Sequence, residues 1–142
     1  MTIAAILSGK GTDVITIDGG ASATDALALL AERRIGAMPV MHGDAVVGIF
    51  SERDIVYCLG KEGADALSRP VRELMTAPAV TVEPDHKVLD ALALMTMRRI
   101  RHLPVVRNGR LAGLVSIGDL VKYRIDRIEK EADAMRDYIR QG

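Results

Sequence analysis

The sequence predicts an α/β (α+β) fold made of two tandem β-α-β-β-α repeats, followed by an amphipathic helix. The first observation is an internal duplication. Shifting the chain by 65 residues aligns Val14–Ile55 with Ala79–Leu120 without a gap, and 14 of the 42 positions are identical. The second is that strand-like and helix-like patterns alternate in the same order in both copies. One repeat has too few strands to stand alone, so the two repeats are expected to pack together.

Each repeat begins with a β-rich run, continues with a segment of helical apolar spacing, and then reaches two further strands joined by a Gly-containing turn. The predicted strands are Val14–Ile17, Met38–Met41 and Val46–Phe50 in the first repeat, and Val80–Val82, Leu103–Val106 and Leu111–Ser116 in the second. The turns between the last two strands of each repeat predict hairpins. A short helix from about Glu52, or from about Ile117, closes each unit.

The duplication also suggests the boundaries of the segments. Residues 1–60 form the first repeat, 61–70 a polar linker, 71–123 the second repeat and 124–142 a C-terminal helix. Val71–Thr76 is typical of a short helical turn and echoes Ile3–Ser8 at the start of the chain. We therefore expect each repeat to include a helical lead-in segment.

The C-terminal segment carries a seam of apolar residues separated by intervals of 4, 3, 4, 3 and 4. The seam consists of Val121, Ile125, Ile128, Ala132, Met135 and Ile139. Two interpretations stay open. The helix lies with its apolar face on its own domain, or it pairs with or crosses a second copy in a homodimer.

The composition disfavours several classes of function. Lys and Arg balance Asp and Glu at 19 each, so no overall charge attracts the chain to nucleic acid or an anionic membrane. The lack of Trp also leaves few platforms for stacking bases. No apolar run or leader-like start is recognised, so a cytoplasmic protein is expected. Cys58 is the single cysteine, and no residue cluster has metal-ligand spacing, so neither a disulfide nor a metal site is expected.

One motif occurs once in each repeat: Gly, two apolar residues, Ser, two variable residues and Asp. It spans Gly48–Asp54 and Gly113–Asp119, where a strand ends at a serine that opens a helix. One interpretation is a helix cap, in which the serine and aspartate satisfy free backbone groups. The other is a nucleotide site, in which the helix N-terminus binds phosphate and the carboxylate accepts ribose hydroxyls. Both interpretations can hold together.

These residues resemble a known family, the tandem cystathionine-β-synthase-type (CBS) domain pair. The resemblance rests on both Gly-to-Asp motifs, on Arg34–Val40 and Arg99–Val105, and on the duplication itself; it covers about Met1 to Tyr123. It implies that the repeats form a pseudo-twofold pair. The clefts between repeats in that family bind adenosine-containing ligands such as AMP, ADP, ATP, NAD(H) or S-adenosylmethionine. Such a nucleotide would be a regulatory ligand, and no cofactor is required.

The resemblance also implies roles for particular residues. Asp54 and Asp119 would hold ribose hydroxyls, and Ser51 and Ser116 would contact ribose or phosphate. Thr76 matches a lead-in threonine that can contact ligand, whereas the first repeat has Ser-Gly-Lys-Gly there with different spacing. The residues expected to enclose the adenine are Ile15, Ile35, Gly36, Ala37, Val80, Ile100, Arg101 and His102.

The two repeats differ where a phosphate would lie. A cleft that combines Asp54 with Arg53, Arg101 and His102 should favour a phosphorylated ligand, because hydrogen bonds between charged groups are the stronger kind. The other cleft combines Asp119 with three small residues, Gly118, Gly36 and Ala37, and so carries less charge. We therefore expect two unequal sites.

The sequence thus predicts a stand-alone sensor: adenine nucleotides bind the clefts between the repeats of a homodimer and modulate an unidentified partner protein, and no reaction is catalysed. A different class of function is a structural dimerisation scaffold whose clefts hold no ligand and whose motifs are only caps. An enzyme acting on nucleotides is a third hypothesis, and only His102 offers a base for it.

Overall fold

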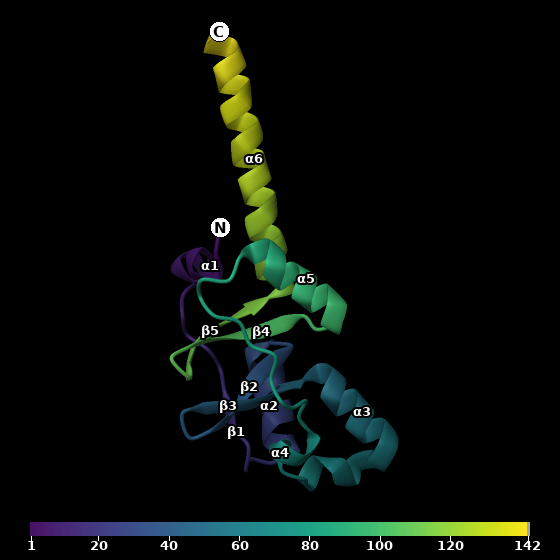
Figure 1. The fold of residues 1–142 in the computed structure, drawn as a ribbon. Coiled ribbons are helices and arrows are strands. Elements are labelled where there is room, and N and C mark those ends of the chain that lie inside the picture. The colour runs from purple at the N-terminus through teal and green to yellow at the C-terminus, as the bar shows by residue number, and fades with distance from the viewer. Residues whose placement is uncertain (142) are drawn as a thin grey trace.

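The computed structural model describes residues 1–141 and shows two α/β halves from which one long helix projects (Figure 1). In chain order the elements are α1 (Ile3–Lys10), β1 (Ile17–Asp18), α2 (Ala23–Arg33), β2 (Ala37–His42), β3 (Ala45–Ser51), α3 (Glu52–Glu62), the 3-10 helix η1 (Gly63–Ser68), α4 (Val71–Leu74), α5 (Val88–Arg98), β4 (His102–Arg107), β5 (Arg110–Ser116) and α6 (Ile117–Gln141). The predicted mixed fold of two repeats is confirmed.

The two hairpins have the same strand pairing at equivalent positions. In the first half β2 pairs antiparallel with β3, with Ala37 opposite Ser51; in the second, β4 pairs with β5, with His102 opposite Ser116. Each hairpin has its register shift at the same place, between Val40 and Met41 or between Val105 and Val106. The predicted hairpins are therefore confirmed, and the equivalence of positions 65 apart extends to three dimensions.

The opening strand of each repeat is shorter than predicted. In the first half β1 contains only Ile17 and Asp18 and runs parallel to β2, while in the second half a single parallel bridge joins Val82 to Val105. The residues just before these pairs, such as Ile15 and Val80, line cavities instead of pairing with a neighbouring strand. The β-rich residues indicate an extended backbone, but they do not show whether that backbone forms hydrogen bonds with a neighbouring strand.

Two separate cores lie under the two sheets. The first core contains Phe50, Met38 and Leu30, and the second contains Leu103, Met95 and Leu120. The lead-in helices are exchanged between these cores. Buried Ile3, Ile6 and Leu7 of α1 belong to the second core, whereas Val71 of α4 belongs to the first. Figure 1 accordingly shows α1 in the half that contains α5, β4 and β5, and α4 in the other half of the molecule.

Backbone hydrogen bonds hold each lead-in segment to the opposite repeat. The amides of Ile3 and Ala4 donate to the carbonyls of His86 and Pro84, at 2.9 and 2.8 Å. On the other side, the amides of Val71 and Arg72 donate to the carbonyls of Ala21 and Gly19, just after β1, at 2.8 and 2.9 Å. Each repeat is therefore completed by the lead-in helix that precedes the other repeat in the sequence: α1 packs on the second repeat and α4 on the first.

Two segments differ from the sequence-based expectation. The polar stretch after α3 is a 3-10 helix, η1, because buried Ala66 and half-buried Leu67 pack on the first core. The short helix expected from about Ile117 and the C-terminal helix are one continuous helix of 25 residues, α6. Gly142 lies outside the described residues. Among residues 1–141, no helix has the length and apolarity needed to span a membrane.

Candidate nucleotide-binding clefts

The junction of β3 and α3 is built by the first Ser-x-x-Asp motif. Ser51 caps α3, and its amide donates to Asp54 Oδ2 at 2.8 Å while the amide of Asp54 donates to Ser51 Oγ at 3.4 Å. In the second repeat the amide of Ser116 donates to Asp119 Oδ2 at 2.8 Å, and the return bond is 3.1 Å. The capping interpretation is therefore confirmed at both motifs, and each aspartate keeps one oxygen for other partners.

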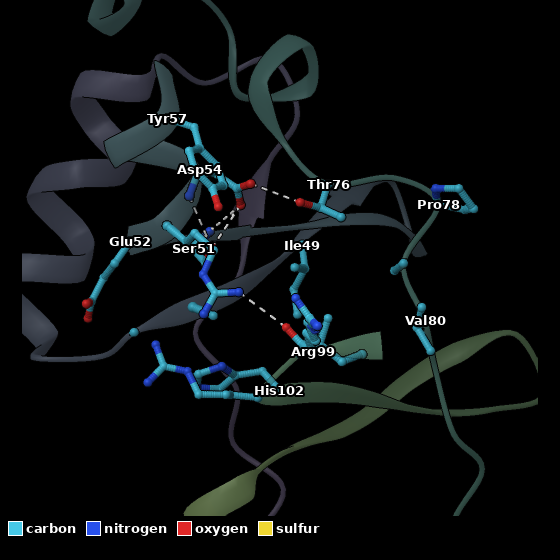
Figure 2. A pocket seen from close by; sticks show the side chains of 16 residues that line it. Ile49, Ser51, Glu52, Asp54, Tyr57, Thr76, Pro78, Val80, Arg99 and His102 are labelled. Atoms are coloured by element: carbon cyan, nitrogen blue, oxygen red, sulfur yellow. Dashed lines mark hydrogen bonds between the residues drawn. The ribbon is translucent and has the colours of Figure 1, made fainter. Parts of the chain in front are cut away.

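A cavity, which we call the first cleft, opens above the Asp54 cap between the two repeats (Figure 2). Ten of the predicted site residues line it: Gly36, Ala37, Ser51, Arg53, Asp54, Thr76, Val80, Ile100, Arg101 and His102. They come from β2, the β3–α3 junction, the chain after α4 and the α5–β4 turn. The structure therefore brings residues from both repeats to one cavity, as the resemblance implies.

The polar groups of the first cleft are held by few contacts. Asp54 Oδ1 accepts a hydrogen bond from the Thr76 hydroxyl at 2.9 Å, and Arg53 Nη1 donates to the carbonyl of Arg99 at 3.3 Å across the repeats (Figure 2). Arg99 can offer that carbonyl because it ends α5 in a left-handed conformation, with φ of 55°. The cleft thus has the Asp54 carboxylate at one end and the guanidinium group of Arg53 on the side that faces the second repeat.

Other residues line this cleft that the sequence did not single out for a ligand. Ile49, Pro78 and Arg99 belong to this group, together with Tyr57 on α3 and Glu52. Ile49 could have been found, because it is one of the two apolar residues inside the Gly-to-Asp motif. Tyr57 carries no such signal, since its contribution depends on the direction in which α3 leaves the sheet.

The pKa of His102 is lowered, first because burial disfavours its charged form and then because Arg101 and Lys10 add positive charge nearby. The neutral ring is therefore the form that the folded protein prefers. Protonation below the ordinary pKa of about 6.5 favours the unfolded chain. Stability contributed by the neutral ring is present above that pH and is lost as the pH falls below it.

We expect His102→Gln to remove this part of the pH dependence. Wild type should lose stability between about pH 6.5 and 5, and His102→Gln should lose less over the same interval. Urea unfolding at several pH values measures the difference, with His42→Gln as a control at an exposed histidine at the end of β2. Equal slopes for wild type and both variants would contradict the assignment.

A second cavity lies beside the motif of the second repeat, and we call it the second cleft. Ile15, Ile35 and Ser116 line it, and Gly36, Ala37 and His102 are shared with the first cleft. Gly118 lines neither cavity, and neither does Asp119. The linings of the two clefts thus differ, and one of the differences is a residue that the sequence analysis did not single out.

That residue is Lys10, at the end of α1. Its Nζ donates to the carbonyl of Leu114 at 2.8 Å and to Asp119 Oδ2 at 2.5 Å. In the first cleft the equivalents of these two partners are Ile49 and Asp54, and Thr76 bonds both: its amide donates to the Ile49 carbonyl at 2.9 Å. The Lys10 ammonium therefore replaces an amide and a hydroxyl of Thr76.

The ion pair changes the state of Asp119. Burial by itself would raise the pKa of this carboxyl, but the hydrogen bonds from Lys10 and Ser116 and the charge of Lys10 outweigh burial and lower it. Asp119 therefore already holds a cationic partner, which shares its Oδ2 atom with the Ser116 amide. Asp54, by contrast, faces its cavity without a cationic side chain bound to it in the described chain.

Comparison with known proteins places this geometry in a family. The family model described as "CBS domain" matches residues 11–61 and again residues 71–126. The chain belongs to the CBS domain family. The two matched segments carry the two Ser-x-x-Asp motifs, so the predicted CBS pair is confirmed.

Individual CBS proteins give the extent of the likeness. The mitochondrial CBS domain-containing protein CBSX3 of Arabidopsis thaliana is 35% identical over 123 residues, which are 83% of this chain and 60% of that protein. The chain thus spans less than two thirds of this relative. The crystal structure of the CBS-domain protein ATU1752 from Agrobacterium tumefaciens is 40% identical, with a TM-score of 0.83, and the match covers 87% of this chain and 92% of that one.

A further CBS structure contains a ligand. CBSX2 in complex with AMP is 28% identical to this chain, with a TM-score of 0.71; the match covers 80% of this chain and 89% of that chain.

Proposed function

We propose that this CBS pair is a regulatory module that binds an adenosine-containing nucleotide in the first cleft and thereby modulates a partner protein. The observation that carries the proposal is the meeting of a carboxylate and cationic side chains from opposite repeats in one cavity. Asp54 has lone pairs that can accept ribose hydroxyls. Arg53 and Arg101 reach the same cavity from different repeats and suit a phosphate.

The remaining surface of the first cleft suits a purine base. Ile49, Val80 and Ile100 supply apolar contacts on either side of the cavity, next to backbone groups that can donate and accept hydrogen bonds. The AMP complex of CBSX2, a CBS relative of similar fold, supports this ligand class. AMP, ATP and NAD(H) all fit the proposal, because each contains the adenosine and phosphate that these residues would recognise.

In this proposal one nucleotide binds per chain. The Lys10 ammonium already occupies Asp119 and the Leu114 carbonyl, so a ribose would have to displace an ion pair to enter the second cleft. In the first cleft a ribose hydroxyl would meet only the uncharged Thr76 hydroxyl at Asp54, so no ion pair has to be broken. Regulation then requires that the nucleotide bind one state of the protein more tightly than another, since a ligand with equal affinity shifts no equilibrium.

The test is a thermal-shift panel of AMP, ADP, ATP, NAD, NADH and S-adenosylmethionine on wild type and on Asp54→Ala. A ligand at a hundredfold excess over its Kd stabilises the folded state by about 2.7 kcal/mol, so wild type should melt several degrees higher. In Asp54→Ala that increase should disappear. The ligand-dependent increase in melting temperature is the quantity to compare, because losing the Asp54 half of the α3 capping box also lowers the stability of the unliganded protein.

Asp119→Ala is the matched control, since it removes the equivalent carboxylate beside Ser116 and leaves the first cleft intact. It should keep the ligand-dependent increase. If no ligand stabilises wild type, the scaffold hypothesis replaces this proposal. No bond is made or broken in the proposed cycle, so ATP or NAD turnover that vanishes in His102→Ala would also contradict it.

A further inference from the structure

The C-terminal part of α6 has no covering partner within the described chain. From Ile125 to Gln141 every residue but Ala132 is exposed, and Figure 1 shows this part of the helix projecting beyond α1 and α5. The ion pairs in this stretch, Arg127 with Glu131 and Arg136 with Asp133, join residues of the helix itself. A single helix of this length is only marginally stable in water, so an unpaired α6 would fray.

The exposed face is apolar and continuous. Ile125, Ile128, Met135 and Ile139 are 48–68% exposed, and Val121 is 42% exposed where the seam reaches the body of the protein. Their spacing alternates between 3 and 4, which is the pattern of a two-helix seam and not of a helix that covers a globular core. The interpretation that this helix lies on its own domain is therefore disfavoured by the structure.

The charges beside the seam select the orientation of a partner. In heptad terms Ile125, Ala132 and Ile139 occupy a positions, and Val121, Ile128 and Met135 occupy d positions. The flanking g and e positions of a parallel, in-register pair then bring Arg124 to Glu129 and Glu131 to Arg136 of the second copy. Both pairs are of opposite charge.

The antiparallel register that aligns the whole seam is disfavoured by the same residues. Placing Ile128 opposite Ala132 of a reversed copy would bring Glu129 and Glu131 next to their own equivalents, and Lys122 next to Arg136. All of these pairs are of like charge. The ion pairs within α6 do not oppose the parallel choice, since exposed pairs at this spacing contribute only about 0.3–0.5 kcal/mol and exchange readily.

We propose that α6 pairs with α6 of a second copy of this chain, parallel and in register, through the seam from Val121 to Ile139. The pair covers the apolar face, and the charge pattern favours this arrangement over the reversed register that aligns the whole seam from Val121 to Ile139. This inference does not depend on nucleotide binding. It predicts that the protein is a dimer in solution and that Ala132 lies against Ala132 of the partner.

The first measurement is the mass in solution by size-exclusion chromatography with light scattering. Wild type should have twice the chain mass of 15.3 kDa. Ile128→Lys with Met135→Lys should give the monomer mass, because lysine keeps the helix but places charge in the seam. Asp126→Asn with Asp137→Asn changes the net charge equally, lies outside the seam and should stay dimeric.

Cysteine crosslinking then tests the orientation. In a Cys58→Ser background, Ala132→Cys should form an intermolecular disulfide readily, because the parallel, in-register pair places these two residues in the same layer, with Cα atoms within about 7 Å. Lys130→Cys, on the outer face of α6, should not. A monomeric wild type, a dimer that survives the seam substitutions, or a dimer without the Ala132→Cys crosslink would each overturn the proposal.

Discussion

Replacing Gly48 with alanine is expected to lower the free energy of unfolding by about 3 kcal/mol and to damage the first cleft. A methyl group at this position would lie 2.8 Å from the Thr76 carbonyl oxygen and 2.5 Å from Met75 Sδ. The methionine can rotate, but the carbonyl belongs to the backbone. Relief therefore requires the segment after α4 to move away from β3, and the two 2.9 Å hydrogen bonds between Ile49 and Thr76 would be lost.

The duplication provides a matched control. At the equivalent Gly113 a methyl group would meet the Leu7 side chain, with its nearest atom at 2.7 Å and no backbone atom among the three nearest. Because a side chain can adjust, Gly113→Ala should cost only about 1–2 kcal/mol. Urea unfolding of both variants measures the difference. A loss in Gly113→Ala equal to or larger than that in Gly48→Ala would contradict the explanation.

Replacing Lys10 with threonine is expected to raise the number of nucleotides bound per chain from one to two. The change removes the ammonium from Asp119 and from the Leu114 carbonyl, and the shorter threonine side chain leaves both groups free for a ligand. Titration calorimetry with AMP measures the stoichiometry directly. Acid stability should change as well, because the carboxylate form of Asp119 loses the partner that lowers its pKa, so less stability is lost as the pH falls toward 3.

Lys87→Thr is the matched control, since Lys87 is an exposed residue at the start of α5 and lines neither cleft. It should leave the stoichiometry at one. Two equivalent sites in wild type would show that Lys10 does not close the second cleft. Suppose instead that Lys10→Thr binds one nucleotide and that adding Asp54→Ala abolishes this binding. The ion pair would then not be what prevents binding in the second cleft.

The sequence was informative where function depends on short segments. Ser51, Asp54, Arg101 and His102 each lie in a motif that occurs twice, and two copies in register indicate both the local structure and the equivalent position. The hairpins follow from the same local signals. Packing the two repeats together then brings the motifs of opposite repeats to one cavity, which the family resemblance implied.

Long-range partnerships could not be predicted in this way. Lys10 reaches an aspartate 109 positions away, and its own segment does not align with the Thr76 segment of the other repeat. A lysine after a short helix is ordinarily a solvated charge, so nothing local marks it. The apolar residues of α1 likewise indicate a buried face, but their spacing does not say which of two similar cores they cover.

The exchange of lead-in helices has a consequence for how the chain matures. Leaving the ribosome, residues 1–60 would contain the first sheet but not Val71, which closes the first core. The helix with Ile3, Ile6 and Leu7 must in turn wait for Leu120 before the second core exists. Neither half can therefore finish folding during early synthesis, and the nascent chain keeps apolar surface open to chaperones until nearly all of the duplication has been translated.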